Sequence, residues 1–168
     1  TLKLFALVLM LIDHIGAVIL EHGVILSYNR QSSYALSYSA SLLVSQIDQI
    51  LRGIGRLAFP IFCFVLVEGF FHTSNRIRYA FRLFLFALLS EVPFDLAFNS
   101  SLLEFSYQNV MFTLLFGLLT IWGMEKAHFI HPFLSILPAA AGIFTGWLFQ
   151  ADYDWRGIIL IIVLYVFY

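Results

Sequence analysis

The chain has 168 residues, of which 61% are hydrophobic and only 11% are charged. Soluble domains average about 45–50% apolar and about 25% charged residues, so this composition excludes a soluble enzyme and predicts an integral membrane protein. The net charge of −1 offers no basic surface to a nucleic acid. The single cysteine, Cys63, excludes an internal disulfide and a zinc site built from cysteines.

Long apolar runs predict an all-α, polytopic membrane bundle. A bilayer core about 30 Å thick needs about 20 mostly apolar residues per helix. Six runs approach this length, and we expect membrane spans at residues 2–20, 57–71, 77–98, 110–124, 133–149 and 157–168. Because apolar runs stand at both ends of the chain, we treat residues 1–168 as a single domain from a larger bundle.

The connection at residues 21–55 carries an apolar stripe in its second half. From Ala40 to Ile54 the apolar residues recur at spacings of three and four. This spacing is typical of an amphipathic helix that lies in the membrane interface or packs on the bundle.

The basic residues favour one orientation in the membrane. If Arg52 and Arg56 belong to a buried site, the remaining Lys and Arg residues divide five to two between the two sides. The side with five holds Lys3, Arg76, Arg78, Arg82 and Lys126. The positive-inside rule then predicts a multi-pass protein with a cytoplasmic N-terminus.

The first span contains Asp13 and His14, and an ionisable residue at a helix centre costs at least about 2.5–3.5 kcal/mol. His14 is therefore a candidate general base or nucleophile, and the alternative is a histidine that only bonds two helices. Lys3 lies eleven residues earlier, about three helical turns away and on the same face. The side chains of successive residues point about 100° apart around a helix. We therefore expect Asp13 to pair with an arginine from another segment rather than with His14.

Arg52 and Arg56 are the nearest candidates, one helical turn apart before the second span. Their guanidinium groups suit a phosphorylated donor, and the alternative is a pair that extends to the membrane surface. Gly53 and Gly55 permit a close approach of backbones or a break in the helix, and Pro60 predicts a kink in the span that follows.

Further polar residues in the second and third spans predict a lattice of buried charges. Glu68 and His72 are spaced for an ion pair, and Glu91 and Asp95 lie one turn apart. Two such carboxylates repel unless one is protonated or a cation such as Arg52 or Arg56 joins them, so a proton relay is the competing interpretation. Asn109 belongs to this lattice or caps a helix. No spacing of ligands predicts a metal site.

Four blocks of sequence together resemble the TraX family, and the likeness extends over nearly the whole chain. The blocks are DHIG (13–16), GRLAFPIF (55–62), SEVPFDLAF (90–98) and QNVMFTL (108–114). The family is named after a conjugative-plasmid protein that acetylates the N-terminus of F pilin. It is distantly similar to membrane acyltransferase family 3 and to heparan-α-glucosaminide N-acetyltransferase. In family 3 a basic residue, ten further residues and a histidine mark the first span, as Lys3 and His14 do here.

The resemblance implies an acyltransferase of the bacterial inner membrane. Its donor would be acetyl-CoA, and its acceptor an amine or hydroxyl of a pilin N-terminus or a cell-envelope glycan. The catalytic residues would be His14, as the base or acyl carrier, and Asp13. Cationic side chains would bind the donor phosphates, namely Lys3, Arg52, Arg56 and Arg82.

Two other classes of function stay open, and so does a homo-oligomeric state. A proton-coupled transporter would use the acidic residues and His14 as proton carriers, although the sequence shows none of the repeats typical of transporters. A structural membrane subunit would use the same charges only to pair helices.

Overall fold

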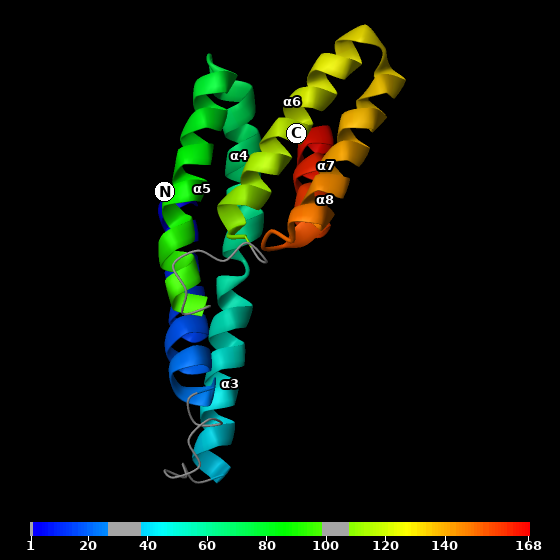
Figure 1. Ribbon diagram of the computed structural model, residues 1–168. Coiled ribbons are helices and arrows are strands. Elements are labelled where there is room, and N and C mark those ends of the chain that lie inside the picture. Colours follow the sequence, from blue (N-terminus) through cyan, green and yellow to red (C-terminus); the bar gives the residue numbers. More distant parts are fainter. Residues whose placement is uncertain (1, 27–37, 99–107) are drawn as a thin grey trace. The chain divides into compact units, whose positions relative to one another are not determined.

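The computed structural model describes residues 2–26, 38–98 and 108–168 (Figure 1). These residues form two units, 1–62 and 63–168, and each unit is described by itself. Within the described residues the secondary structure is helical, and a single isolated bridge pairs Gln108 with Ala151. Parts of the predicted connections, including Arg30, lie outside the described residues.

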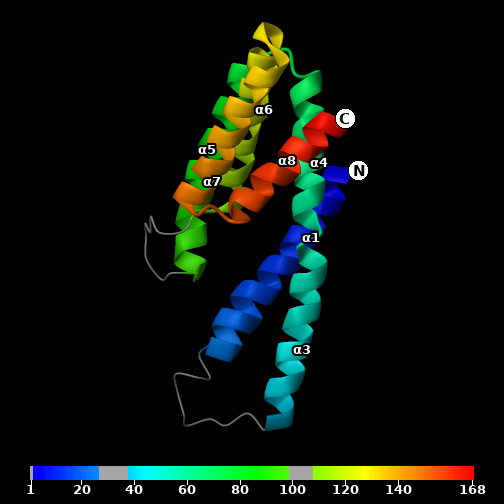
Figure 2. The same cartoon turned by 90° about the vertical axis from the view of Figure 1, so that its right-hand side faces the viewer.

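The first unit is built on three helical segments. α1 (Leu2–His14) continues into a π-helix, η1 (Ile15–Leu26), and α3 (Tyr38–Gly55) packs along both of them (Figure 2). Small side chains such as Ala6 and Ala17 are buried in this unit. The predicted amphipathic helix is therefore confirmed as α3, and it packs back on the first span.

The winding of the first span differs from the expected continuous α-helix. The α-helical winding ends at His14, and π-helical winding begins at Ile15. Leu2–Leu20 is still long and apolar enough to cross a membrane.

The predicted kink at Pro60 is wrong. α3 ends at Gly55, a turn occupies Arg56 and Leu57, and α4 begins at Ala58. Pro60 thus lies in the first turn of α4 (Ala58–His72), where a missing backbone N–H removes no helical hydrogen bond. The helix breaks before the proline, not at it.

The second unit contains most of α4, followed by α5 (Arg76–Phe98), α6 (Val110–Ile130), η2 (Pro132–Ser135), α7 (Ile136–Phe149) and α8 (Asp154–Phe167). α6 is its centre, because it packs against α5, α7 and α8. Close packing depends on glycine: a Cβ at Gly142 would overlap Thr120, and one at Gly117 would overlap Ile161.

Helix is confirmed in all six predicted spans, so the protein is a helical membrane bundle. Among the residues that the structure describes, four segments are long and apolar enough to cross a membrane: Leu2–Leu20, Leu42–His72, Val110–Ile130 and Pro132–Phe149. α5 has the length, but three arginines and two carboxylates interrupt its apolar character. α8 is apolar, but its 14 residues make it shorter than a full span.

Candidate functional site

The centre of the first unit is an ion pair between α1 and α3. Arg52 Nη1 donates to Asp13 Oδ2 at 2.9 Å, and the two side chains are 26% and 22% exposed. The prediction that Asp13 pairs with an arginine rather than with its neighbour His14 is confirmed. Arg52 is predicted as a donor-binding residue, and in the structure its guanidinium group forms an ion pair with Asp13.

Glycine lets the two helices come this close. A Cβ at Gly55 would lie 2.6 Å from Asp13 Cα and 2.8 Å from its backbone nitrogen, so only glycine fits. Gly16 faces Arg52, whose Cδ would lie 3.3 Å from an added Cβ. Around Gly53 there is open space. A close approach is therefore observed at Gly55 and not at Gly53, and the alternative, a break, follows directly after Gly55, where α3 ends.

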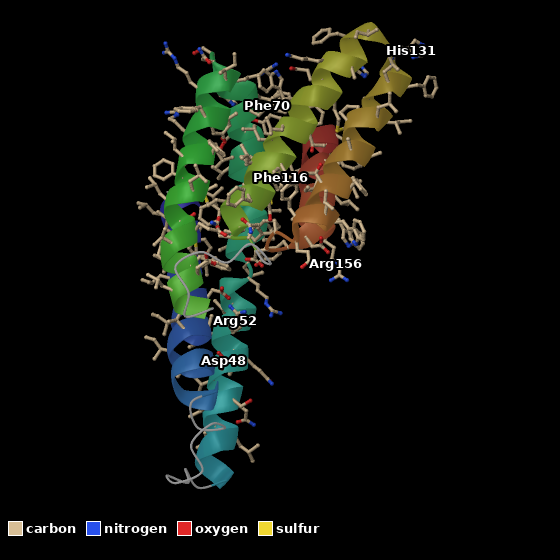
Figure 3. All side chains as sticks on the ribbon, viewed as in Figure 1. Asp48, Arg52, Phe70, Phe116, His131 and Arg156 are labelled. Carbon is tan, nitrogen blue, oxygen red and sulfur yellow. The ribbon has the colours of Figure 1, made fainter. Side chains whose placement is uncertain are left out.

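Asp48 also belongs to this site, although the sequence interpretation missed it. Asp48 and Arg52 lie along the same helix, α3, one turn apart (Figure 3). Asp48 Oδ1 and Asp13 Oδ1 are both buried and have no hydrogen-bond partner among the described residues. The i, i+4 spacing to Arg52 was the available signal, because residues at that spacing are neighbours on a helix.

His14 is exposed at the end of α1, with one ring nitrogen already engaged. Its Nδ1 lies 2.7 Å from the backbone carbonyl of Met10. A carbonyl oxygen only accepts, so Nδ1 carries the hydrogen, and Nε2 of the neutral ring keeps its lone pair. The accessible nitrogen is thus the one that can accept a proton or attack an acyl group.

The other predicted donor-binding residues are exposed. Lys3 lies in the first turn of α1, and Arg56 follows the end of α3. Arg82 belongs to the second unit, where it lines a groove at the start of α5. The structure thus leaves the side chains of Lys3, Arg56 and Arg82 accessible to a ligand.

A buried polar contact joins α5 to the start of α6 in the second unit. Asn109 is the N-cap of α6, and its Oδ1 accepts from the backbone N–H of Met111 at 2.9 Å. Its Nδ2 donates to the carbonyl of Ala87 at 3.0 Å and also to Glu91 Oε2. Both interpretations of Asn109, helix cap and lattice member, are therefore correct. Glu91 Oε1 is buried and has no partner among the described residues.

Asp95 and Glu68 are the remaining residues assigned to the lattice from the sequence. Asp95 is fully buried, one turn after Glu91. Between Glu68 and His72 the observed hydrogen bond joins His72 Nδ1 to the backbone carbonyl of Glu68 at 2.8 Å, and not to its carboxylate. The i, i+4 spacing brings a terminal histidine back onto the helix backbone, where the carbonyl is nearer than a flexible side chain.

A second interhelical ion pair joins α5 to α6. Arg76 binds Glu125 with two hydrogen bonds, one of them 2.8 Å from Nη2 to Oε1. The guanidinium carbon also lies 4.3 Å from the centre of the Phe70 ring. The sequence interpretation missed this pair. Within the described residues no group of three histidine, cysteine or carboxylate side chains is arranged to hold a metal ion.

The fold and these charged pairs define a helical membrane protein with ionisable groups inside its helix contacts. The profile of the TraX protein family matches residues 1–168, so the chain belongs to the TraX family.

One curated relative gives a more specific comparison. The chain is 39% identical over 98 residues to the probable fimbrial assembly protein FimC, serogroup H1, of Dichelobacter nodosus. That alignment covers 52% of this chain and 40% of the relative, so the chain matches less than half of the relative's length. No solved structure matches the chain.

Proposed function

We propose that this protein is a membrane acyltransferase that acts in pilus or fimbrial assembly. The observation that carries the proposal is the geometry of His14, whose exposed ring bonds the Met10 carbonyl through Nδ1 and therefore has its lone pair on Nε2. Membership of the TraX family and the fimbrial relative support the biological setting. Asp13 and Arg52 act as positioning residues, because they join α3 to the turn that carries His14.

The reaction is acetyl transfer from acetyl-CoA to an amine or hydroxyl, either at a pilin N-terminus or on an envelope glycan. His14 Nε2 takes a proton from the acceptor while the acceptor atom attacks the thioester carbonyl. The carbon–sulfur bond breaks, and the CoA thiolate leaves with the proton that the imidazolium returns. In the same unit as His14, the exposed cations Lys3 and Arg56 provide charge for the donor phosphates.

The proposed location is the bacterial inner membrane with a cytoplasmic N-terminus. In the second unit, the chain bears Arg76, Arg78, Arg82 and Lys126 near the α4–α5 turn and the end of α6. The opposite ends of α6 and α7 meet the turn that carries Arg156. The positive-inside rule then favours the end with more basic residues as cytoplasmic, which is also where acetyl-CoA is available.

The test compares two histidines that share the same local geometry. His72 also ends a helix and bonds the carbonyl four residues earlier at 2.8 Å, so it is a matched control for His14. The full chain in nanodiscs is incubated with labelled acetyl-CoA and an envelope extract. We expect His14→Ala to lower label transfer about 100-fold or more, since general base catalysis contributes about 10²–10⁴-fold, and His72→Ala to leave it unchanged. Full transfer by folded His14→Ala protein would contradict the assigned role.

A proton-coupled transporter is the second candidate, and one observation favours it. Glu91 is buried in α5 with one carboxylate oxygen unpartnered among the described residues, as a proton carrier in a membrane would be. This candidate predicts substrate flux into proteoliposomes without any acyl-CoA, and Glu91→Gln would abolish that flux. If acyl transfer is observed and flux is not, the transporter is excluded.

A further inference from the structure

A groove with two arginines lies where α4 turns into α5. Its volume is about 360 Å³, and its lining consists of Thr73, Ser74, Asn75, Arg78, Phe81 and Arg82. All of these residues belong to the second unit. The groove is therefore formed by the α4–α5 turn and the first two turns of α5.

The turn that forms the groove is held by its own hydrogen bonds. Asn75 Oδ1 accepts from the backbone N–H of Arg78 at 2.9 Å, and Thr73 Oγ1 donates to the carbonyl of Asn75 at 3.5 Å. Asn75 thus caps the start of α5 (Arg76–Phe98), where the partial positive charge of the helix is concentrated. The hydroxyl of Ser74 stands beside this helix end as a further donor.

Arg78 and Arg82 have no carboxylate partner in the described part of the chain. The two residues lie one turn apart and are exposed, and neither forms an ion pair within the described part of the chain. Arg76, in the same turn of α5, is by contrast fully engaged by Glu125 and Phe70. Two guanidinium groups therefore remain available on one side of a groove.

We propose that this groove binds a phosphate group. Guanidinium groups bind phosphate oxygens with two parallel hydrogen bonds, and hydroxyls and a helix N-terminus add donors to the same anion. Phe81, 58% exposed, provides an apolar surface for whatever carries the phosphate. A chain that only extended its arginines to the membrane surface would need neither the groove nor the hydroxyls.

The phosphate has two possible sources, a soluble nucleotide-like ligand or the headgroup of an anionic lipid. Phosphate binding itself is measured separately from transfer, so the two can fail independently.

The experiment measures binding to the full chain in phosphatidylcholine nanodiscs. The soluble probe is adenosine 3′,5′-bisphosphate, with adenosine as its phosphate-free control, and the lipid probe is short-chain phosphatidylglycerol. The variants are Arg78→Gln and Arg82→Gln, singly and together. Arg156→Gln is the matched control, because Arg156 is also exposed but lies at the other end of this unit (Figure 3).

We expect each groove variant to bind about tenfold more weakly, because each loses a charge-assisted hydrogen bond, and Arg156→Gln to bind as the wild type does. Binding should also weaken as salt is added. A loss confined to the bisphosphate assigns a soluble ligand, and a loss confined to phosphatidylglycerol assigns a headgroup. The inference is overturned if the wild type binds neither probe, or if the double variant binds both as well as the wild type does.

The variants and the transfer assay together separate this inference from the proposed function. His14→Ala should bind the probes normally, because His14 belongs to the first unit and does not line the groove. Normal binding with no transfer in the wild type would leave the phosphate site intact and reject the acyltransferase.

Discussion

Two arginine–carboxylate pairs join helices in this protein, and they differ in how completely each carboxylate is used. Glu125 places both oxygens on Arg76, and the Phe70 ring covers the guanidinium. Asp13 receives Arg52 on one oxygen, and its other oxygen has no hydrogen-bond partner among the described residues. In the Arg76–Glu125 pair both carboxylate oxygens are hydrogen-bonded. In the Arg52–Asp13 pair one carboxylate oxygen can still accept a hydrogen bond.

The difference indicates different roles. A bidentate pair with a stacked ring suits a fixed joint between two helices. An incomplete pair beside a second buried carboxylate, Asp48, and directly before an exposed histidine suits a site. Unpaired polar groups in a buried place cost stability, so proteins retain them where function needs them.

The largest predicted effect comes from Gly55→Ala, which disrupts the contact between α1 and α3 beside the Asp13–Arg52 pair. Gly55→Ala forces a Cβ against the backbone of Asp13, which cannot move aside as a side chain can. We expect a loss of about 2–3 kcal/mol, the upper part of the usual range for overpacking, measured as a lower unfolding midpoint in detergent. Gly53→Ala is the control: it meets open space, and replacing a helical glycine should stabilise the protein by up to about 1 kcal/mol. Equal destabilisation by both variants would contradict the close approach.

The next prediction separates the two arginine pairs by what they do. Arg76→Gln and Arg52→Gln should each lower stability by about 1–2 kcal/mol, between the values typical of exposed and buried ion pairs. Only Arg52→Gln should lower acyl transfer per folded molecule, by about tenfold, because displacing a reacting group by about 1 Å is costly. Transfer is compared at equal amounts of folded protein.

Arg52→Lys keeps the charge opposite Asp13 and serves as the rescue variant. It should restore part of the transfer lost in Arg52→Gln. If Arg76→Gln lowers transfer as much as Arg52→Gln does, the functional contrast between the two pairs is wrong.

The smallest predicted effect concerns Asp48. Its Oδ1 is buried without a hydrogen bond among the described residues, so Asp48→Asn removes a poorly satisfied charge. We expect stability to change by less than about 0.5 kcal/mol and transfer by less than about twofold. The thermal unfolding midpoint measures the stability, and the labelled transfer assay measures the activity. If Asp48→Asn lowers stability or transfer as much as Arg52→Gln does, Asp48 is an essential part of the Asp13–Arg52 site.

Several parts of the site could be predicted from the sequence because they depend on local geometry. The divergence of sequential side chains correctly separates Asp13 from His14, and the glycine at position 55 correctly predicts a close contact. Partners that are far apart in the chain were harder to predict. Arg76 and Glu125 are 49 residues apart, and no periodicity links them.

The predictions for Pro60 and His72 were wrong because each residue can adopt either of two arrangements in or near a helix. Pro60 either kinks a helix or begins one, and the turn at Arg56 and Leu57 decides for the second. His72 either pairs with the Glu68 carboxylate or returns to the backbone, and the structure shows the second. The position of each residue relative to its helix end decides the outcome, and helix ends are poorly determined by sequence pattern alone.

By itself, the sequence determined that this is a helical membrane protein, since a scarcity of charge and long apolar runs leave no other way to satisfy the backbone in lipid. It also determined the TraX resemblance that the family profile confirms. Only the tertiary structure decided which charges meet: Arg52 is paired with Asp13 and Arg76 with Glu125, while Arg78 and Arg82 face a groove. The reason is that periodicity specifies the face of one helix, whereas an ion pair requires two faces in register.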